Sequence, residues 1–184
     1  ALVEVRQRLQ RTGRGDGPPR RPDRRPRVGR RHGGLIDLAG DDKYDSGNWS
    51  AGVGYWYGMG FLYDKSGNDQ YRATTFSLAS GAHFCVGAIL DDGGNEIYEG
   101  RGDARTGMGF GHDFTVSILF DRSGDDTYRL PGDGLGEAIN TSQAFFVDGA
   151  GEGTLRLSFS ALPLGQIDEG AKRLAEAIVE AQRQ

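Results

Sequence analysis

The sequence predicts an all-β fold, namely a parallel β-helix (solenoid) of coils of about 27 residues with a C-terminal helical cap. Glycine supplies 31 of the 184 residues, which disfavours a helical domain because each interior glycine weakens a helix. Five segments share the pattern apolar, apolar, Asp, x, x, Gly, Asp/Asn, Asp/Glu, x, Tyr, although the last has Leu155 in place of Tyr. Their leading aspartates are spaced by 27, 27, 30 and 27 residues. Such a period indicates stacked units whose cores are completed by their neighbours.

Short apolar runs define the strands expected within each coil. Runs such as GMGFLY and CVGAIL precede the leading aspartate, and a second run such as SLASGAHF follows the tyrosine. Short runs between glycines are typical of strands, and 27 residues hold about three short strands and three bends at roughly 3.3 Å per residue. The alternative is an antiparallel sheet of repeated β units. We prefer the solenoid, because equal-length coils bring identical residues into register.

The chain divides into three parts. Residues 1–34 are a basic, largely disordered segment with 11 arginines against Glu4, Asp16 and Asp23, a net charge of +8. This segment either binds an anionic polymer or lipid headgroups, or has no dedicated partner. Residues 35–165 form the solenoid, and residues 166–184 form the capping helix. The apolar stripe of that helix comprises Ile167, Ala171, Leu174, Ala175, Ile178 and Val179. The first residues also show a weak helical pattern, with Leu2, Val5 and Leu9 on one face, and could cap the other end.

Charge and composition limit the classes of function. Residues 35–184 carry 11 Lys and Arg against 23 Asp and Glu, a net charge of −12 that brings the whole chain to −4. This acidic body argues against nucleic acid as a partner and suits cations. A single cysteine, Cys85, excludes an intrachain disulfide and a cysteine metal site. We expect no membrane span, because no apolar run is long enough, and the oligomeric state stays open.

In a solenoid the repeated acidic residues become columns. Carboxylates stacked about 5 Å apart repel one another, and Ca²⁺, which binds six to eight oxygens, would offset that repulsion. The predicted calcium ligands are Asp37, Asp41, Asp42, Asp64, Asn68, Asp69, Asp91, Asn95, Glu96, Asp121, Asp125 and Asp126. The alternative is that these side chains accept hydrogen bonds from their own turns and need no metal.

The turns SGNDQY, SGDDTY and GGNEIY resemble the glycine- and aspartate-rich nonapeptide of repeats-in-toxin (hemolysin-type) calcium-binding proteins. The resemblance implies that the aspartate of one coil and the turn carbonyls of adjacent coils bind Ca²⁺ together. The matching aspartate positions are Asp42, Asp69, Glu96 and Asp126. The chain departs from that family in having one motif per coil of about 27 residues and Asp at the first glycine position. It also resembles bacterial secreted β-solenoids with D-x-x-G-[DN]-D-x-Y repeats.

These patterns predict a structural or interaction module, a calcium-binding β-solenoid of a secreted or surface protein, without catalysis. Its partners would be surface glycans or proteins, and its location extracellular or on the cell surface. The alternative is a β-helix polysaccharide lyase or hydrolase acting on acidic glycans, with candidate residues in the irregular third coil. Those residues are Arg101, Arg105, His112 and Asp113.

Two further arrangements involve histidine. His83 and His112 lie 29 residues apart, so neighbouring coils could bring them together as a metal-binding pair, although two separate histidines are the simpler interpretation. His83 and Cys85 would share one face of a strand and could form a nucleophile pair. The alternative is that both belong to a partly buried strand with no chemical role.

Overall fold

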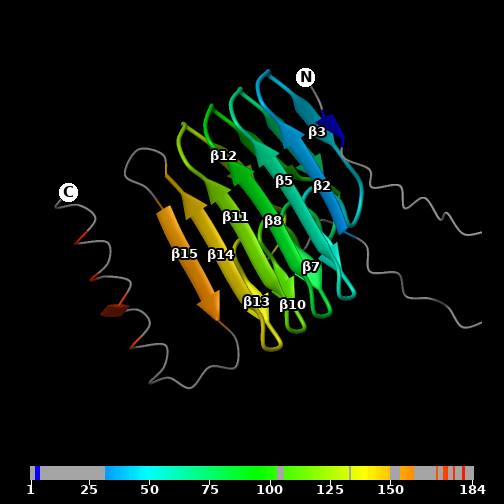
Figure 1. The fold of residues 1–184 in the computed structure, drawn as a ribbon, viewed down its shortest axis with the longest axis vertical. Helices are drawn as coiled ribbons and strands as arrows, with labels where there is room; N and C mark the ends of the chain where they lie inside the picture. Colours follow the sequence, from blue (N-terminus) through cyan, green and yellow to red (C-terminus); the bar gives the residue numbers. More distant parts are fainter. Residues whose placement is uncertain are drawn as a thin grey trace, which may run out of the picture.

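The computed structural model describes residues 3–4, 32–102, 106–132, 134–149 and 154–159, together with 169, 172–173, 176 and 180. It confirms the predicted parallel β-solenoid. Three sheets run along the stack, and each full coil contributes one strand to each sheet, parallel to those of its neighbouring coils. Figure 1 shows the long strands of the largest sheet side by side in sequence order.

The largest sheet holds the strands that end on the leading aspartates. Its order is β1 (Val3–Glu4), β2 (His32–Asp37), β5 (Met59–Asp64), β8 (Val86–Asp91), β11 (Val116–Asp121), β14 (Gln143–Asp148) and β15 (Thr154–Phe159). From β2 to β14 the strands are parallel, and their register pairs each leading aspartate with that of the next coil. The 27-residue spacing therefore predicted the register correctly.

Two smaller sheets complete the coil. One contains β3 (Lys43–Asp45), β6 (Gln70–Ala73), β9 (Ile97–Gly100) and β12 (Thr127–Arg129), which carry the repeated tyrosine. The other contains the two-residue strands β4 (Gly54–Tyr55), β7 (Gly81–Ala82), β10 (Gly111–His112) and β13 (Ala138–Ile139). Three short strands and three bends per coil match the expectation from coil length.

Both ends of the largest sheet differ from the simple repeat. The predicted N-terminal helix is wrong at Val3–Glu4, which pair antiparallel with β2 instead. The fifth repeat does not open another coil, because β15 returns antiparallel to β14 and pairs Leu155 with Val147. This copy lacks the tyrosine that the other copies place in the core, and it closes the sheet as a hairpin. The basic residues 5–31 and the apolar stripe of the C-terminal segment lie outside the described residues, whereas 169, 172–173, 176 and 180 are helical and exposed.

A ladder of tyrosines forms one side of the core. Tyr44, Tyr71, Tyr98 and Tyr128 stack with ring centroids 4.6–4.9 Å apart and planes within 9° of parallel. Tyr71 and Tyr98 are fully buried, as the sequence predicts for core residues. A buried aliphatic and aromatic column from the largest sheet packs with them in the same cluster, namely Leu62, Ile89, Leu119 and Phe146.

One corner of every coil has unusual backbone geometry. Two successive residues adopt positive φ between the two-residue strand and the next long strand, for example His83 (φ 67°) and Phe84 (φ 57°). The other pairs are Trp56 and Tyr57, Asp113 and Phe114, and Asn140 and Thr141. Few non-glycine residues adopt this conformation, so its recurrence in every coil means that the neighbouring coils hold it.

The three extra residues of the third coil lie between Gly100 and Gly107. Ala73 pairs with Gly100, and Ser77 bridges to Gly107, so the three residues between these pairs in one coil are matched by six in the next. His112 and Asp113 lie beyond this insertion, at β10 and the corner that follows it. Residues 103–105, including Arg105, lie outside the described part of the chain.

Candidate functional site

The leading aspartates form hydrogen bonds with both the repeated turn and the tyrosine ladder. Asp91, fully buried, accepts the Gly93 N–H through Oδ1 at 3.1 Å and the Tyr71 hydroxyl through Oδ2 at 2.6 Å. Asp64 is bound in the same way, by the Ser66 N–H at 3.2 Å and by the hydroxyl of Tyr44. Hydrogen bonds from the turn and from the tyrosine ladder therefore hold Asp64 and Asp91 in the way that the metal-free alternative describes.

The second column is exposed and links the backbones of successive coils. The Asn68 N–H donates to Asp41 Oδ1 at 2.8 Å, and the Asn95 N–H donates to Asn68 Oδ1 at 3.0 Å. The Asp125 N–H continues the ladder by donating to Asn95 Oδ1 at 2.8 Å. Because these side chains use their oxygens to cap the next turn, they act as structural links between coils.

The third column points inward and is incompletely satisfied. Asp69 and Glu96 are at most 1 % exposed. Asp69 Oδ1 accepts the Asp42 N–H at 2.6 Å, and Asp126 Oδ1 accepts the Glu96 N–H at 2.7 Å. Among the described residues, however, Asp69 Oδ2, Asp126 Oδ2 and both Glu96 carboxylate oxygens, together with Asp121 Oδ1 of the leading column, are buried and accept no hydrogen bond. Unpartnered buried carboxylate oxygens are costly, so these positions require either protons or a cation.

These oxygens belong to two groups that meet at Glu96. Asp69, Asp91 and Glu96 form the first group, and Glu96, Asp121 and Asp126 form the second. In each group one ligand atom from every residue lies within 4.8 Å of the others. At an effective dielectric constant of about 20, two ionised carboxylates at this distance repel each other by about 3 kcal/mol. We call these two groups the Glu96 clusters.

The pKa values of these carboxyls reflect burial and mutual repulsion. Burial raises the pKa of Asp69 to about 7, against the lowering effect of the backbone hydrogen bond from Asp42 and with smaller increases from the charges of Asp64 and Asp91. Burial, followed by the charge of Asp126, raises the pKa of Asp121 to about 7. Burial and the charge of Asp91 raise the pKa of Glu96 to about 10.

In the absence of a cation, the Glu96 clusters therefore keep protons at neutral pH that ordinary carboxyls release. The clusters offer oxygen donors alone, the chemistry that hard divalent cations prefer. Their buried unpartnered oxygens fit such a cation. Five of the twelve predicted ligands, Asp69, Asp91, Glu96, Asp121 and Asp126, belong to these clusters. The structure does not bring the other seven predicted ligands into the Glu96 clusters. Asp37 and Asp64 cap turns, and Asp42 donates its N–H to Asp69. The remaining four form the exposed ladder, namely Asp41, Asn68, Asn95 and Asp125.

The other sequence candidates have different surroundings. Cys85 is buried, its thiol donates to the Ala82 carbonyl at 3.1 Å, and burial raises its pKa. His83 lies at a corner rather than on a strand, so the predicted shared strand face with Cys85 is wrong. Arg101 forms an ion pair with Asp45. Arg105, the other basic candidate of the lyase or hydrolase alternative, lies outside the described residues.

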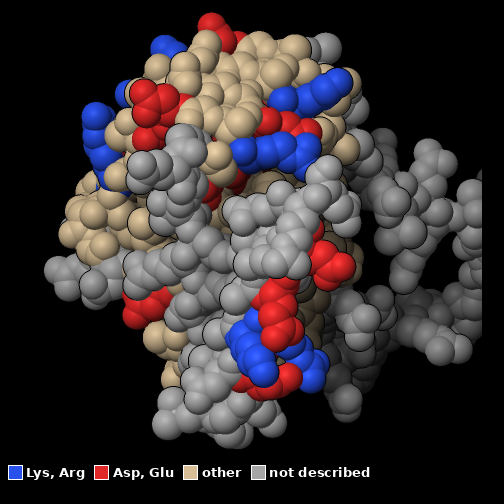
Figure 2. Space-filling model, turned by 90° about the vertical axis from the view of Figure 1, so that its left-hand side faces the viewer, with Lys and Arg blue, Asp and Glu red and all other residues tan. Residues whose placement is uncertain are grey.

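A ridge of exposed aromatic rings was not anticipated from the sequence. Tyr57, Phe84 and Phe114 stack along the corner with centroids 5.2 and 4.7 Å apart, and each is about half exposed. Alignment of the segments before each long strand would have placed the three rings in one column. On the face drawn in Figure 2, the described basic and acidic side chains are interspersed rather than gathered in a patch of one sign.

Comparisons with protein-family models, curated proteins and solved structures give no significant match. The fold therefore defines the class of protein, a parallel β-solenoid, and its function has to be inferred from its sites. No helix among the described residues is long and apolar enough to cross a membrane.

Proposed function

We propose that this protein is a calcium-binding β-solenoid, a structural or interaction module of a secreted or surface protein, whose Glu96 clusters bind Ca²⁺ between adjacent coils. One observation carries the proposal: both carboxylate oxygens of Glu96 are buried and accept no hydrogen bond from the described residues. A cation there would satisfy those oxygens and remove the repulsion among the carboxylates that meet at Glu96.

The chemistry of the clusters favours Ca²⁺ over Mg²⁺. Each cluster supplies three carboxylates, which together can offer up to six oxygens. Ca²⁺ accepts six to eight oxygens in flexible geometry, whereas Mg²⁺ requires a near-ideal octahedron and usually keeps several waters. Asp69, Asp91 and Glu96 are too buried for a heavily hydrated ion. A calcium-rich exterior would then supply the ion.

Cation binding would join three successive coils. Asp69 belongs to the second coil, Asp91 and Glu96 to the third, and Asp121 and Asp126 to the fourth. An ion bound by ligands from two coils stabilises the stacked state alone, because the unfolded chain does not bring those ligands together. Calcium would therefore act on the stability of the stack.

Calorimetric titration of the full chain with Ca²⁺ at about pH 7 tests the proposal. We expect heat of binding and a higher melting temperature, both abolished by Glu96→Gln, which removes the carboxylate that the two clusters share. Asp125→Asn is the matched control, because Asp125 lies in the same turn region but in the exposed ladder. The proposal is refuted if Ca²⁺ leaves the melting temperature of the unmodified chain unchanged, or if Glu96→Gln binds Ca²⁺ as the unmodified chain does.

A further inference from the structure

A second group of potential ligands lies at the corner that follows the two-residue strands. His83 comes from the second of these corners, Asp113 comes from the third, and His112 is the last residue of β10, directly before it. We propose that His83, His112 and Asp113 form a binding site for a divalent transition-metal ion, with zinc as the best match. This site shares no residue with the Glu96 clusters and does not depend on them.

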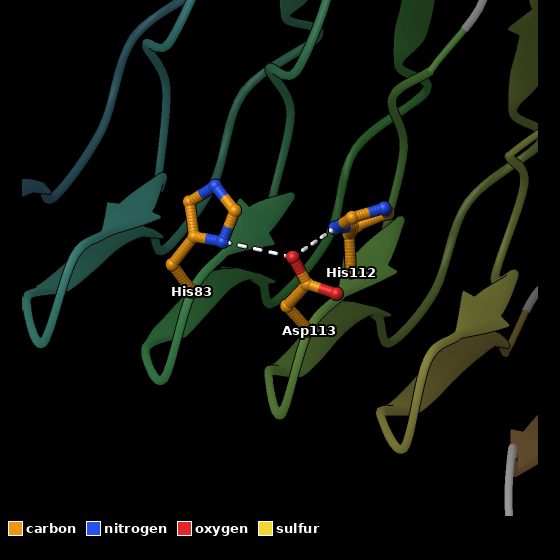
Figure 3. A group of neighbouring side chains, drawn as sticks. All are labelled: His83, His112 and Asp113. Carbon is orange, nitrogen blue, oxygen red and sulfur yellow. Dashed lines mark ion pairs between the residues drawn. The ribbon is translucent and has the colours of Figure 1, made fainter.

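The three side chains already converge. His83 Nδ1 and His112 Nδ1 each lie 2.9 Å from the same atom, Asp113 Oδ2. Figure 3 shows the two imidazoles on opposite sides of the carboxylate, with His83 reaching across from the neighbouring coil. One ligand atom from each residue lies within 4.8 Å of the others, and all three side chains are partly exposed. A metal ion could therefore enter from solvent.

The backbone fixes the positions of these side chains. His83 and Asp113 occupy the same place in successive coils, both with positive φ. The His83 N–H donates to the His112 carbonyl at 3.2 Å, and the Phe84 N–H donates to the Asp113 carbonyl at 2.9 Å. These bonds between coils hold both corners in an uncommon conformation, so the ligands are positioned before any metal binds.

The donor set is that of a transition-metal site. Two imidazole nitrogens and one carboxylate oxygen suit zinc or a neighbouring first-row metal, whereas Ca²⁺ takes oxygen. In a tetrahedral zinc site with bonds of about 2.0–2.2 Å, donor atoms lie about 3.3–3.6 Å apart. The present 2.9 Å contacts need to open by only about half an ångström. Three protein ligands leave a fourth position for water or an external ligand.

Neighbouring residues can orient the ligands. Asn140 Nδ2 donates to Asp113 Oδ1 at 3.0 Å and lies 3.3 Å from His112 Nε2. If His112 binds the metal through Nδ1, its proton moves to Nε2, and the oxygen of a rotated Asn140 amide can accept a hydrogen bond from that N–H. The ring of Trp56 packs against His83 with centroids 4.7 Å apart. Asn140 is therefore a positioning residue for this site.

Without a metal, the same contacts would be two histidines donating to one carboxylate. Titration of the full chain with Co²⁺, in millimolar Ca²⁺ so that oxygen-donor sites are already occupied, distinguishes the two cases. We expect one equivalent of Co²⁺ to give the visible ligand-field bands of low-coordinate nitrogen and oxygen ligation, and one equivalent of Zn²⁺ to displace it. Absence of these bands in the unmodified chain would overturn the proposal.

Two substitutions that copy the residues at equivalent positions of other coils separate a loss of metal binding from a loss of folding. The column of His83 contains Asn140, and the column of His112 contains Ala82, so His83→Asn and His112→Ala place residues that the other coils already accept. We expect each variant to lower Co²⁺ affinity by at least about tenfold, as losing an orienting partner alone does, while the melting temperature in chelator changes little. His32→Ala, which removes the remaining histidine on β2, is the control. Unchanged bands in His83→Asn, or bands lost in His32→Ala, would contradict the assignment.

Discussion

The stability of the cation-free protein should fall as the pH rises through the range in which most proteins are most stable. Glu96 has its pKa raised to about 10 by burial and by the charge of Asp91, whereas its value in the unfolded chain is about 4.3. A carboxyl with a raised folded-state pKa takes up a proton on folding. Its stabilising contribution is complete below the unfolded pKa and is lost as the pH rises toward the folded pKa.

The magnitude follows from this linkage. One extra proton in the folded state reduces the free energy of unfolding by about 1.4 kcal/mol for each pH unit. Between about pH 5 and pH 7, Glu96 alone would therefore cost about 3 kcal/mol, a large part of a typical stability of about 5–15 kcal/mol. The pKa values of Asp69 and Asp121 are each raised to about 7, mainly by burial. These two carboxyls therefore make the loss of stability with rising pH steeper up to about pH 7. A loss of about 3 kcal/mol lowers the melting temperature by roughly 6–12 °C in a domain of this size.

Denaturant unfolding in chelator at several pH values, at constant ionic strength, measures this slope. Glu96→Gln should flatten it by about 1.4 kcal/mol per pH unit, while Asp125→Asn should leave it unchanged. Ca²⁺ should stabilise the unmodified chain more at pH 7 than at pH 5, because the ion has to displace the protons. A chelated protein whose stability stays level or rises between pH 5 and pH 7 would refute the reasoning, as would a Glu96→Gln variant that keeps the full slope.

Two further predictions concern the parts of the repeat that hold the turn. Tyr71→Phe removes the 2.6 Å hydrogen bond to buried Asp91 and should lower the free energy of unfolding by about 1.5–3 kcal/mol in a denaturation assay. The control is Tyr63→Phe, which removes a hydrogen bond of equal length to Asp92 at a less buried site. It should have a much smaller effect in the same assay. Gly94→Ala would place a Cβ 1.4 Å from the stacked glycine carbonyl of the preceding coil, so we expect a loss of more than about 3 kcal/mol or failure to fold. Gly47→Ala, where nothing lies within 4 Å of the added Cβ, should be nearly neutral, and equal melting temperatures for the two alanine variants would contradict the close approach.

The period of the leading aspartates was enough to predict the coils, because a register error in a stacked sheet would move every side chain to the wrong face. The same logic fails at the two ends of the described sheet, where antiparallel strands take the place of a further coil. Val3–Glu4 illustrates this at one end, since a segment with weak helical periodicity pairs as a strand with β2. At the other end Leu155, which replaces the repeated tyrosine, lies in the antiparallel strand β15.

The candidate sites were predicted only in part, because spacing does not show which way a turn side chain points. Asp125 and Asp126 are adjacent and chemically alike, yet Asp125 is exposed in the ladder and Asp126 joins a Glu96 cluster. The difference arises from the turn, which directs successive side chains to opposite sides of the backbone. The corner site was predicted in part: the sequence suggested His83 and His112 as a pair, but not Asp113, which the three-residue insertion places in the column of His83.

Glu96 is the one residue of the third column in the full coils that is not an aspartate, and its longer side chain explains why the two clusters meet. Position 96 carries glutamate, whereas the equivalent residues in the other three full coils, among them Asp69 and Asp126, are aspartates. The additional methylene lets one carboxylate approach both the Asp69 side and the Asp126 side of its coil, and Glu96 accordingly belongs to both groups. An aspartate in its place would have a shorter reach, so the clusters would lose their common member. The third coil is therefore the point at which both clusters of carboxyl groups meet, with members from the second and fourth coils on either side.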